Sequence, residues 1–175
     1  MMKNSECKKR KRVCLVLALC WMTVIFMFSA RNADLSTQDS MSIGIFFGRL
    51  IVPSFSDMDT QMQISFAGQV DHPIRKLAHA TEYAILGFLL TGSYADSSTK
   101  RRKAWLLPAV TGSLYAVSDE LHQMFVPGRS CEIRDMLIDS SGVLIGTCIG
   151  IFVFVYWKRR QYGQADVGRG SDRSK

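Results

Sequence analysis

The residues best suited to chemistry gather in one stretch, Tyr115 to Asp135, whose sequence is YAVSDELHQMFVPGRSCEIRD. This stretch combines carboxylate, imidazole and guanidinium groups, although the chain on either side of it is apolar. Carboxylate and imidazole side chains transfer protons or bind divalent metals, and guanidinium groups hold phosphates through paired hydrogen bonds. The stretch therefore predicts acid–base chemistry or the binding of an anionic group, depending on the elements that surround it.

The chain around this stretch predicts an all-α integral membrane fold with four transmembrane helices. Four segments are apolar over most of their length: 13–30, 77–95, 104–126 and 136–157. A helix needs about 20 such residues to cross the hydrocarbon core of a bilayer. The predicted four-helix membrane domain therefore covers residues 13–157, with an outer segment at 31–76. It is flanked by a basic N-terminus, 1–12, and a basic tail, 158–175.

Basic residues orient the predicted helices. Of the 22 Lys and Arg residues, 16 lie in 1–12, 100–103 and 158–175, next to the ends of the apolar segments. Such residues favour the cytoplasmic side of a membrane, so both termini are predicted to be cytoplasmic and the polar stretch extracytoplasmic. Basic runs also occur in nucleic-acid-binding proteins. These runs abut apolar helices and lack interleaved aromatic residues, so no nucleic-acid partner is predicted.

The first apolar segment also has the basic start of a signal peptide. Cleavage after Ala30 would need a small residue at Phe28, and a lipoprotein-type cleavage before Cys20 would need one at Leu19. The segment is therefore predicted to be a retained helix. The five cysteines predict no disulfide framework, because only Cys131 is expected to face the outside.

In this orientation, three helix ends bring polar side chains to the extracytoplasmic face. Side chains three or four positions apart share a face of a helix, which groups His79 with Glu82 and Asp119 with His122. An ionisable group at the centre of a membrane helix costs about 2.5–3.5 kcal/mol. Solvation by headgroups or a structural salt-bridge network would explain any one of these residues, but the whole set indicates a shared polar cavity. The candidate catalytic residues are His79, Glu82, Asp119, His122 and Asp135.

Two further features concern packing. The outer stretch 42–55 is apolar but too short to span, so it is predicted to be interfacial or re-entrant. It would cover the cavity and guide an amphiphile, or simply pack at the membrane surface. Gly142, Gly146 and Gly150 form a small-residue ladder in the last predicted helix. Such ladders let helices approach closely, which predicts packing within the chain and, as the weaker alternative, a homo-oligomer.

Three blocks of the chain carry a specific pattern: FMFSARNADLSTQDS (26–40), RKLAHATEYAILGFLL (75–90) and YAVSDELHQMFVPGRSCEIRDMLIDSSGVLIG (115–146). With its K-x-x-H-x-x-E-Y start followed by D-E-x-H-Q-x-F-x-P-G-R, the chain resembles the VanZ-like family. The positions that match the pattern are Lys76, His79, Glu82, Tyr83, Asp119, Glu120, His122, Gln123, Pro127, Gly128, Arg129 and Asp135. Asp139 departs from it, because the family often has Asn there.

The resemblance implies a multi-pass protein of the bacterial cell membrane that belongs to the cell envelope. The family's namesake is associated with resistance to the glycopeptide teicoplanin, so the resemblance also implies a link to that resistance. It implies no defined reaction. The candidate binding residues, some of which could hold an anionic headgroup, are Lys76, Tyr83, Glu120, Gln123, Arg129 and Arg134.

Two functions fit the predicted cavity. The favoured one is a protein of the lipid bilayer that binds or handles an anionic envelope lipid or precursor. The alternative is a membrane enzyme acting on a lipid-linked phosphate, with His122 as a general base or with a divalent metal. The candidate metal ligands are His79, Glu82, Asp119 and His122, although no short metal-ligand motif is present. A purely structural role in the envelope would leave the polar cluster unexplained.

Overall fold

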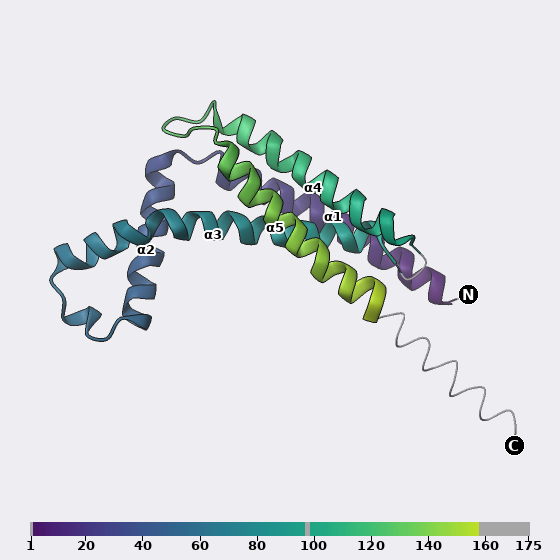
Figure 1. The fold of residues 1–175 in the computed structure, drawn as a ribbon, viewed down its shortest axis with the longest axis horizontal. Coiled ribbons are helices and arrows are strands. Elements are labelled where there is room, and N and C mark those ends of the chain that lie inside the picture. The colour runs from purple at the N-terminus through teal and green to yellow at the C-terminus, as the bar shows by residue number, and fades with distance from the viewer. Residues whose placement is uncertain (1, 97–98, 158–175) are drawn as a thin grey trace, which may run out of the picture.

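The computed structural model describes residues 2–96 and 99–157, and the regular elements of this part of the chain are all helical (Figure 1). Five α-helices follow one another: α1 (Met2–Ser29), α2 (Ala33–Ile51), α3 (Thr60–Tyr94), α4 (Arg101–Gln123) and α5 (Ile133–Ile151). A short 3-10 helix, η1 (Phe55–Asp57), precedes α3, and a π-helical segment, η2 (Phe152–Trp157), continues α5. The all-α prediction is confirmed for these residues. The predicted basic tail, 158–175, lies outside them.

Two helices in the described part of the chain are long and apolar enough to cross a bilayer. They are Ser5–Ser29, within α1, and Ile133–Tyr156, which joins α5 to η2. The other two predicted spans correspond to parts of α3 and α4, and these helices are less apolar because they carry charged residues such as Glu82 and Asp119. The apolar helices are what is expected of a membrane protein, and the full set of four spans stays a prediction.

The segment 31–76 is more helical than the sequence predicted. The Asn32 side chain caps α2 by accepting a hydrogen bond from the backbone N–H of Leu35 at 3.0 Å. Most of the short apolar stretch 42–55 therefore lies in a helix of 19 residues. α3 begins at Thr60, well before the predicted start at residue 77, and so carries Asp71 and Arg75 in a regular helix.

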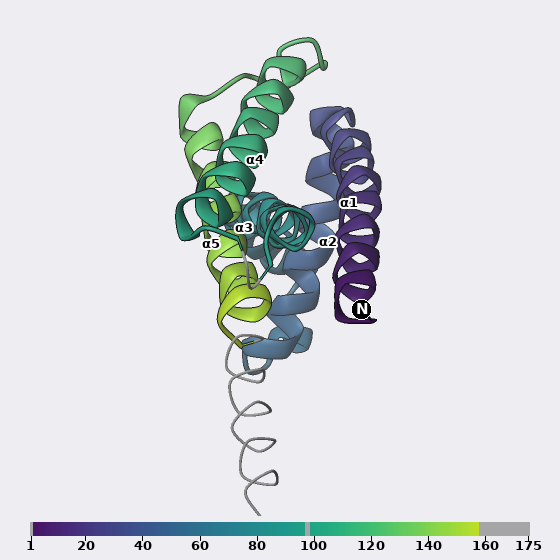
Figure 2. The same cartoon turned by 90° about the vertical axis from the view of Figure 1, so that its right-hand side faces the viewer.

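Helix α3 lies at the centre of the molecule and packs against each of the other four α-helices (Figure 2). Its most extensive interface is with α5, where Gly142 and Gly146 face the backbone carbonyls of Ala80 and Ala84. A Cβ atom at either glycine would collide with those carbonyls, so the absence of a side chain permits the close approach. Since α3 occupies the glycine ladder within the chain, a homo-oligomer through the same residues would have to displace α3.

The apolar core lies between α1, α3, α4 and α5. Its buried members include Ile25 of α1, Leu86 of α3, Ala116 of α4 and Val143 of α5. Tyr83 is also fully buried in this core. Burial of these side chains holds α1, α4 and α5 around α3 and fixes the relative positions of their ends.

The two ends of this bundle are formed by different segments of the chain. At one end, Lys11 forms a 2.6 Å ion pair with Asp96, and Arg10 donates a hydrogen bond to the backbone carbonyl of Ala95 at 2.6 Å. The basic start of α1 therefore lies beside the connection from α3 to α4. The end of α1, the end of α4 and the start of α5 meet at the opposite end (Figure 1). The candidate site lies there.

Candidate functional site

The turn after α4 joins the link between α1 and α2. Gly128 has a φ of +76°, a left-handed conformation that favours glycine, and so turns the chain back toward α5. The backbone N–H of Ala33 donates a hydrogen bond to the carbonyl of Pro127 at 3.4 Å. The guanidinium Nε of Arg129 donates another to the carbonyl of Arg31 at 3.1 Å. These contacts join two blocks of the sequence pattern, 26–40 and 115–146, at one end of the bundle.

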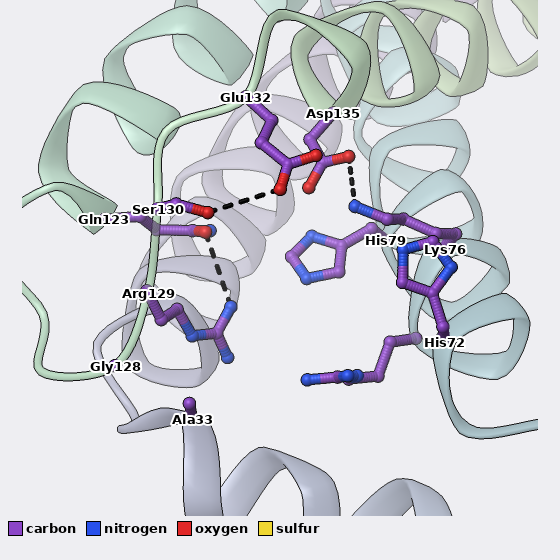
Figure 3. A pocket seen from close by; sticks show the side chains of 11 residues that line it. Ala33, His72, Lys76, His79, Gln123, Gly128, Arg129, Ser130, Glu132 and Asp135 are labelled. Atoms are coloured by element: carbon purple, nitrogen blue, oxygen red, sulfur yellow. Dashed lines mark hydrogen bonds and ion pairs between the residues drawn. The ribbon is translucent and has the colours of Figure 1, made fainter. Parts of the chain in front are cut away.

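A polar cavity of about 150 Å³ lies at this junction (Figure 3). Arg129 from the turn and His79 from α3 point toward its middle, and Gln123 and Asp135 stand at its wall. Its charged and polar lining residues are His72, Arg75, Lys76, His79, Gln123, Arg129, Ser130, Glu132 and Asp135. The predicted shared polar cavity therefore exists, and its lining combines three cations with two carboxylates.

Ion pairs neutralise two of these cations directly. Lys76 of α3 pairs with Asp135 of α5 across the helix interface. Arg75 pairs with Asp71, one helical turn earlier on α3, at 2.6 Å. Both pairs are partly exposed at the cavity, so solvent screens them in part.

Arg129 is held differently. Within the described residues its guanidinium has no carboxylate partner at ion-pair distance, and its Nη1 donates to the side-chain oxygen of Gln123 at 3.4 Å. Burial lowers the pKa of Arg129 from its ordinary value, and the nearby positive charge of Arg75 lowers it further. Arginine nevertheless stays protonated in proteins. The charges of Asp119, Glu120 and Glu82 act on it without direct contact, so Arg129 contributes a positive charge that no direct ion pair balances.

A second, larger cavity of about 490 Å³ adjoins the first. It lies against the end of α1, one side of α2 and the middle of α3. The two cavities share Arg75, His79 and Arg129 as lining residues. Apolar side chains line much of the second cavity: Phe28, Ile43, Ile74 and Ala78. The polar cavity and the largely apolar cavity therefore adjoin where these three side chains line both of them.

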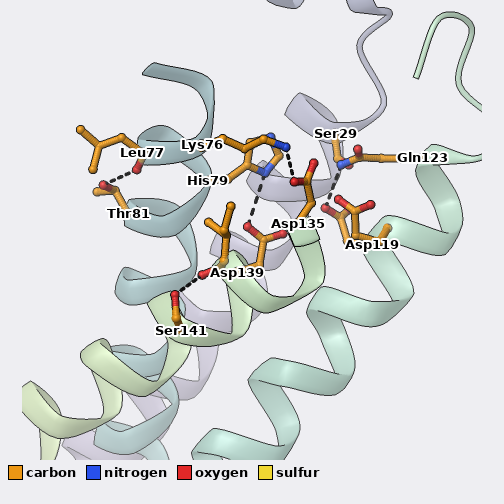
Figure 4. A network of polar contacts seen from close by, with 12 residues as sticks. Ser29, Lys76, Leu77, His79, Thr81, Asp119, Gln123, Asp135, Asp139 and Ser141 are labelled. Atoms are coloured by element: carbon orange, nitrogen blue, oxygen red, sulfur yellow. Dashed lines mark hydrogen bonds and ion pairs between the residues drawn. The ribbon is translucent and has the colours of Figure 1, made fainter. Parts of the chain in front are cut away.

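Several acidic side chains lie beneath the cavities and are almost fully buried. Asp119, Glu120 and Asp139 are 3%, 1% and 1% exposed. Figure 4 shows Asp119 and Gln123 of α4 beside Ser29 of α1, whose Oγ accepts a 2.7 Å hydrogen bond from the Gln123 amide. Glu120 accepts one from the backbone N–H of Glu132 at 3.1 Å. These contacts connect α4 to α1 and to the start of α5 directly under the polar cavity.

His79 stands between the cavity and the buried acids. Its Nδ1 lies 3.9 Å from Oδ1 of Asp139, so this side chain connects the polar cavity to the buried carboxylates (Figure 4). Asp139 has no hydrogen-bond partner for either carboxylate oxygen among the described residues. Because buried polar atoms are normally paired, the contact with His79 gives Asp139 a neighbour that can carry a proton.

The structure separates the predicted site residues into groups. His79, Asp135, Lys76, Gln123 and Arg129 line the polar cavity, and Glu82 lines the larger one. Asp119, Glu120 and Tyr83 are buried below the cavities and line neither of them. Arg134 is exposed and also lines neither. The prediction thus located the cavity, although only part of the predicted set faces it.

His122 differs most from its predicted role. Its ring packs against Phe26 of α1 with the centroids 4.6 Å apart, and it lines neither cavity. It shares a helix face with Asp119, as predicted, but that face is turned toward α1. His122 and His79 therefore point to different parts of the molecule.

The predicted metal ligands do not converge. Among the residues that the structure describes, no group of three or more His, Cys, Asp or Glu side chains is arranged to hold a metal ion. His79 and Glu82 reach the cavities, Asp119 lies below them, and His122 packs on α1. The four candidates are thus distributed over different surroundings, which gives the divalent-metal interpretation no geometric support in this part of the chain.

The sequence analysis missed the residues that position Arg75. One carboxylate oxygen of Asp71 accepts a hydrogen bond from Ser40 of α2, and the other pairs with Arg75. Asp71 is 8% exposed, so this contact is a buried connection between α2 and α3. The i,i+4 spacing of Asp71 and Arg75 was the available signal, but it falls in a segment that was not predicted to be helical.

A family model described as VanZ/LLP1 matches residues 14–160 of the chain, which includes most of α1 and all of α2 to α5. No curated protein and no solved structure matches the chain.

Proposed function

The chain belongs to the VanZ/LLP1 family, and on that premise we propose that it binds an anionic envelope lipid or lipid-linked precursor at the extracytoplasmic face of the bacterial cell membrane. In this proposal α1, α3, α4 and α5 cross the membrane and both termini are cytoplasmic. The apolar α1 and α5 support this arrangement, as do the basic residues at the end of the bundle opposite the cavities.

The observation that carries the proposal is the shared wall between the two cavities. An anionic amphiphile needs cations for its head and an apolar surface for its chain. The polar cavity supplies Arg75, Lys76 and Arg129, and the adjoining cavity supplies apolar side chains such as Phe28 and Ile43. Because the two share residues, one molecule could occupy both compartments.

The position of α2 also supports a lipid ligand. α2 crosses α3 rather than running along the bundle (Figure 1), and its exposed side chains include Phe46, Phe47 and Leu50. A helix with such a face is typical of a membrane interface. With α2 at the outer interface, the larger cavity would be next to the lipid from which an amphiphile enters.

The resemblance to a family whose namesake is associated with teicoplanin resistance supports a proposed link between this binding and that resistance. We propose that the protein protects the envelope by holding a lipid or precursor at this site. The buried carboxylates under the cavity would act as an electrostatic scaffold that keeps the cations directed at the ligand.

The test compares teicoplanin growth inhibition in a susceptible Gram-positive host at matched membrane levels. The strains carry no insert, the intact protein, Arg129→Gln or Arg49→Gln. Arg49 is an exposed cation on α2 that lines neither cavity, so it is the matched control. The lipids that co-purify with each variant are measured in parallel.

We expect the intact protein and Arg49→Gln to protect the host and to retain anionic lipid, and Arg129→Gln to lose both. Protection without retained lipid would refute the binding role. Retained lipid without protection would leave binding intact and remove the link to teicoplanin.

A further inference from the structure

Resting on the proposed lipid-binding function, we infer that the site selects a phosphate headgroup, which it holds between the guanidinium groups of Arg75 and Arg129. The chain of the same molecule then lies in the larger cavity along α2. The inference thus names the chemical class of the ligand and the two residues that recognise it.

The first support is the placement of two arginines from different elements. Arg75 comes from α3 and Arg129 from the turn after α4, yet both line both cavities. Their charges are near enough for Arg75 to lower the pKa of Arg129. Two partly buried cations repel each other where the dielectric constant is low. An anion between them would replace that repulsion with two attractions.

The second support is the balance of charge at the cavity. Asp71 pairs with Arg75 and Asp135 pairs with Lys76. The Arg129 guanidinium is held only by neutral oxygens, the backbone carbonyl of Arg31 and the side-chain amide of Gln123. Glu132, the other carboxylate of the polar cavity, accepts a hydrogen bond from Ser130 rather than pairing with Arg129. Direct pairing therefore leaves the Arg129 guanidinium without a carboxylate in contact at the point where the two cavities meet.

The third support is the way each guanidinium is fixed. Asp71 holds Arg75 through Nη2 at 2.6 Å, and Ser40 of α2 holds the other oxygen of Asp71. Arg129 uses Nε and Nη1 for its protein contacts, which leaves Nη2 for a ligand. Both groups are held by the protein before binding, so less side-chain entropy is lost when the ligand arrives.

A phosphate suits this arrangement better than a carboxylate. A planar carboxylate matches the fork of one guanidinium group, whereas the oxygens of a tetrahedral phosphate can accept hydrogen bonds from two guanidinium groups in different directions. The polar cavity, at about 150 Å³, is smaller than the roughly 300–1,000 Å³ of ordinary ligand pockets. It is therefore suited to a headgroup alone, and the 490 Å³ cavity beside it can hold part of a chain.

The experiment measures calorimetric binding to the full-length protein in detergent. The probes are dihexanoyl phosphatidic acid, dihexanoyl phosphatidylcholine, decanoate and inorganic phosphate. The variants are Arg75→Lys and Arg129→Lys, which keep the charge but remove the fork, with Arg49→Lys as the control. Thermal unfolding of each variant verifies that it is folded.

We expect phosphatidic acid to bind at least about tenfold more tightly than decanoate. A carboxylate loses the charge-assisted hydrogen bonds to the second of the two guanidinium groups. Arg75→Lys and Arg129→Lys should each weaken phosphatidic acid binding by about tenfold, and Arg49→Lys should not change it. Inorganic phosphate should bind more weakly than phosphatidic acid, because it gains nothing from the larger cavity.

The possible failures can be told apart. Equal affinity for phosphatidic acid and decanoate, or unchanged affinity in both cavity variants, would overturn phosphate selection and leave amphiphile binding in place. Inorganic phosphate binding as tightly as phosphatidic acid would show that a free anion is the ligand and overturn the role of the larger cavity. Absence of binding by every anionic probe would overturn the proposed function as well.

Discussion

Lys76 of α3 and Asp135 of α5 form an ion pair across the interface of the two helices that pack most closely. Both side chains are about 20% exposed, so the pair is neither fully solvated nor fully buried. It joins the helix that carries most of the cavity cations to the helix that follows the turn.

Removing one member of this pair should destabilise the protein by about 1–3 kcal/mol, between the values for exposed and buried pairs. Lys76→Met leaves Asp135 unpaired, and Asp135→Leu leaves Lys76 unpaired. The double variant should recover most of the loss, since no partly buried charge is then left alone. Thermal unfolding of the four proteins in detergent measures the coupling, and strictly additive losses would contradict it.

Gly146→Ala should destabilise the protein by at least about 2 kcal/mol, because the new Cβ would collide with the backbone carbonyl of Ala84. Gly68→Ala is the matched control. Gly68 lies in α3 with nothing within 4 Å of its added Cβ, and alanine there should stabilise the helix by about 0.5–1 kcal/mol. Melting temperatures that fall equally in both variants would show that α5 does not pack on α3 as described.

His79→Gln should reduce phosphatidic acid binding and teicoplanin protection several-fold, whereas His122→Gln should leave both near the intact level. The reason is that His79 lines both cavities and His122 packs on Phe26 outside them. The two measurements are made at matched membrane levels. If His122→Gln melts normally but no longer binds phosphatidic acid, His122 contributes to the binding site and the prediction is wrong.

Two cysteines report the proposed topology. Cys131 lies in the turn beside the cavities, and Cys7 lies near the start of α1 at the other end of the bundle. In intact cells, a membrane-impermeant maleimide should label a variant that retains only Cys131. A variant that retains only Cys7 should be labelled only after the membrane has been permeabilised. Labelling of Cys7 in intact cells would reverse or abolish the proposed orientation.

Much of the fold could be predicted because long apolar segments are a strong signal. The predicted segments coincide with the second halves of α1 and α3, with most of α4, and with α5 and η2 together. Helix α2 and the first part of α3 were missed because they carry many polar residues and one apolar stretch, 42–55, that is too short to span. Their helical form is stabilised by packing, for example of Gly44 against Ala67 and Val70, which local sequence does not report.

The site could be predicted in part for a related reason. The prediction that helix ends bring their polar residues together grouped Lys76, His79, Arg129 and Asp135, and all four line the polar cavity. Their functional roles stay a prediction. The spacing of residues along a helix shows which side chains share a face, but it does not show which other helix packs against that face. His122 was therefore grouped with the cavity, although its face meets α1.

The central position of α3 has a consequence for how the chain is made. α3 is synthesised before α4 and α5, yet α5 covers its small residues at Ala80 and Ala84 and supplies Asp135 to Lys76. A nascent chain that ends after α4 has an open seam along α3 and a lysine without its partner. α5 therefore closes the core and pairs Lys76, so a chain truncated before α5 would expose both the small residues of α3 and an unpaired lysine.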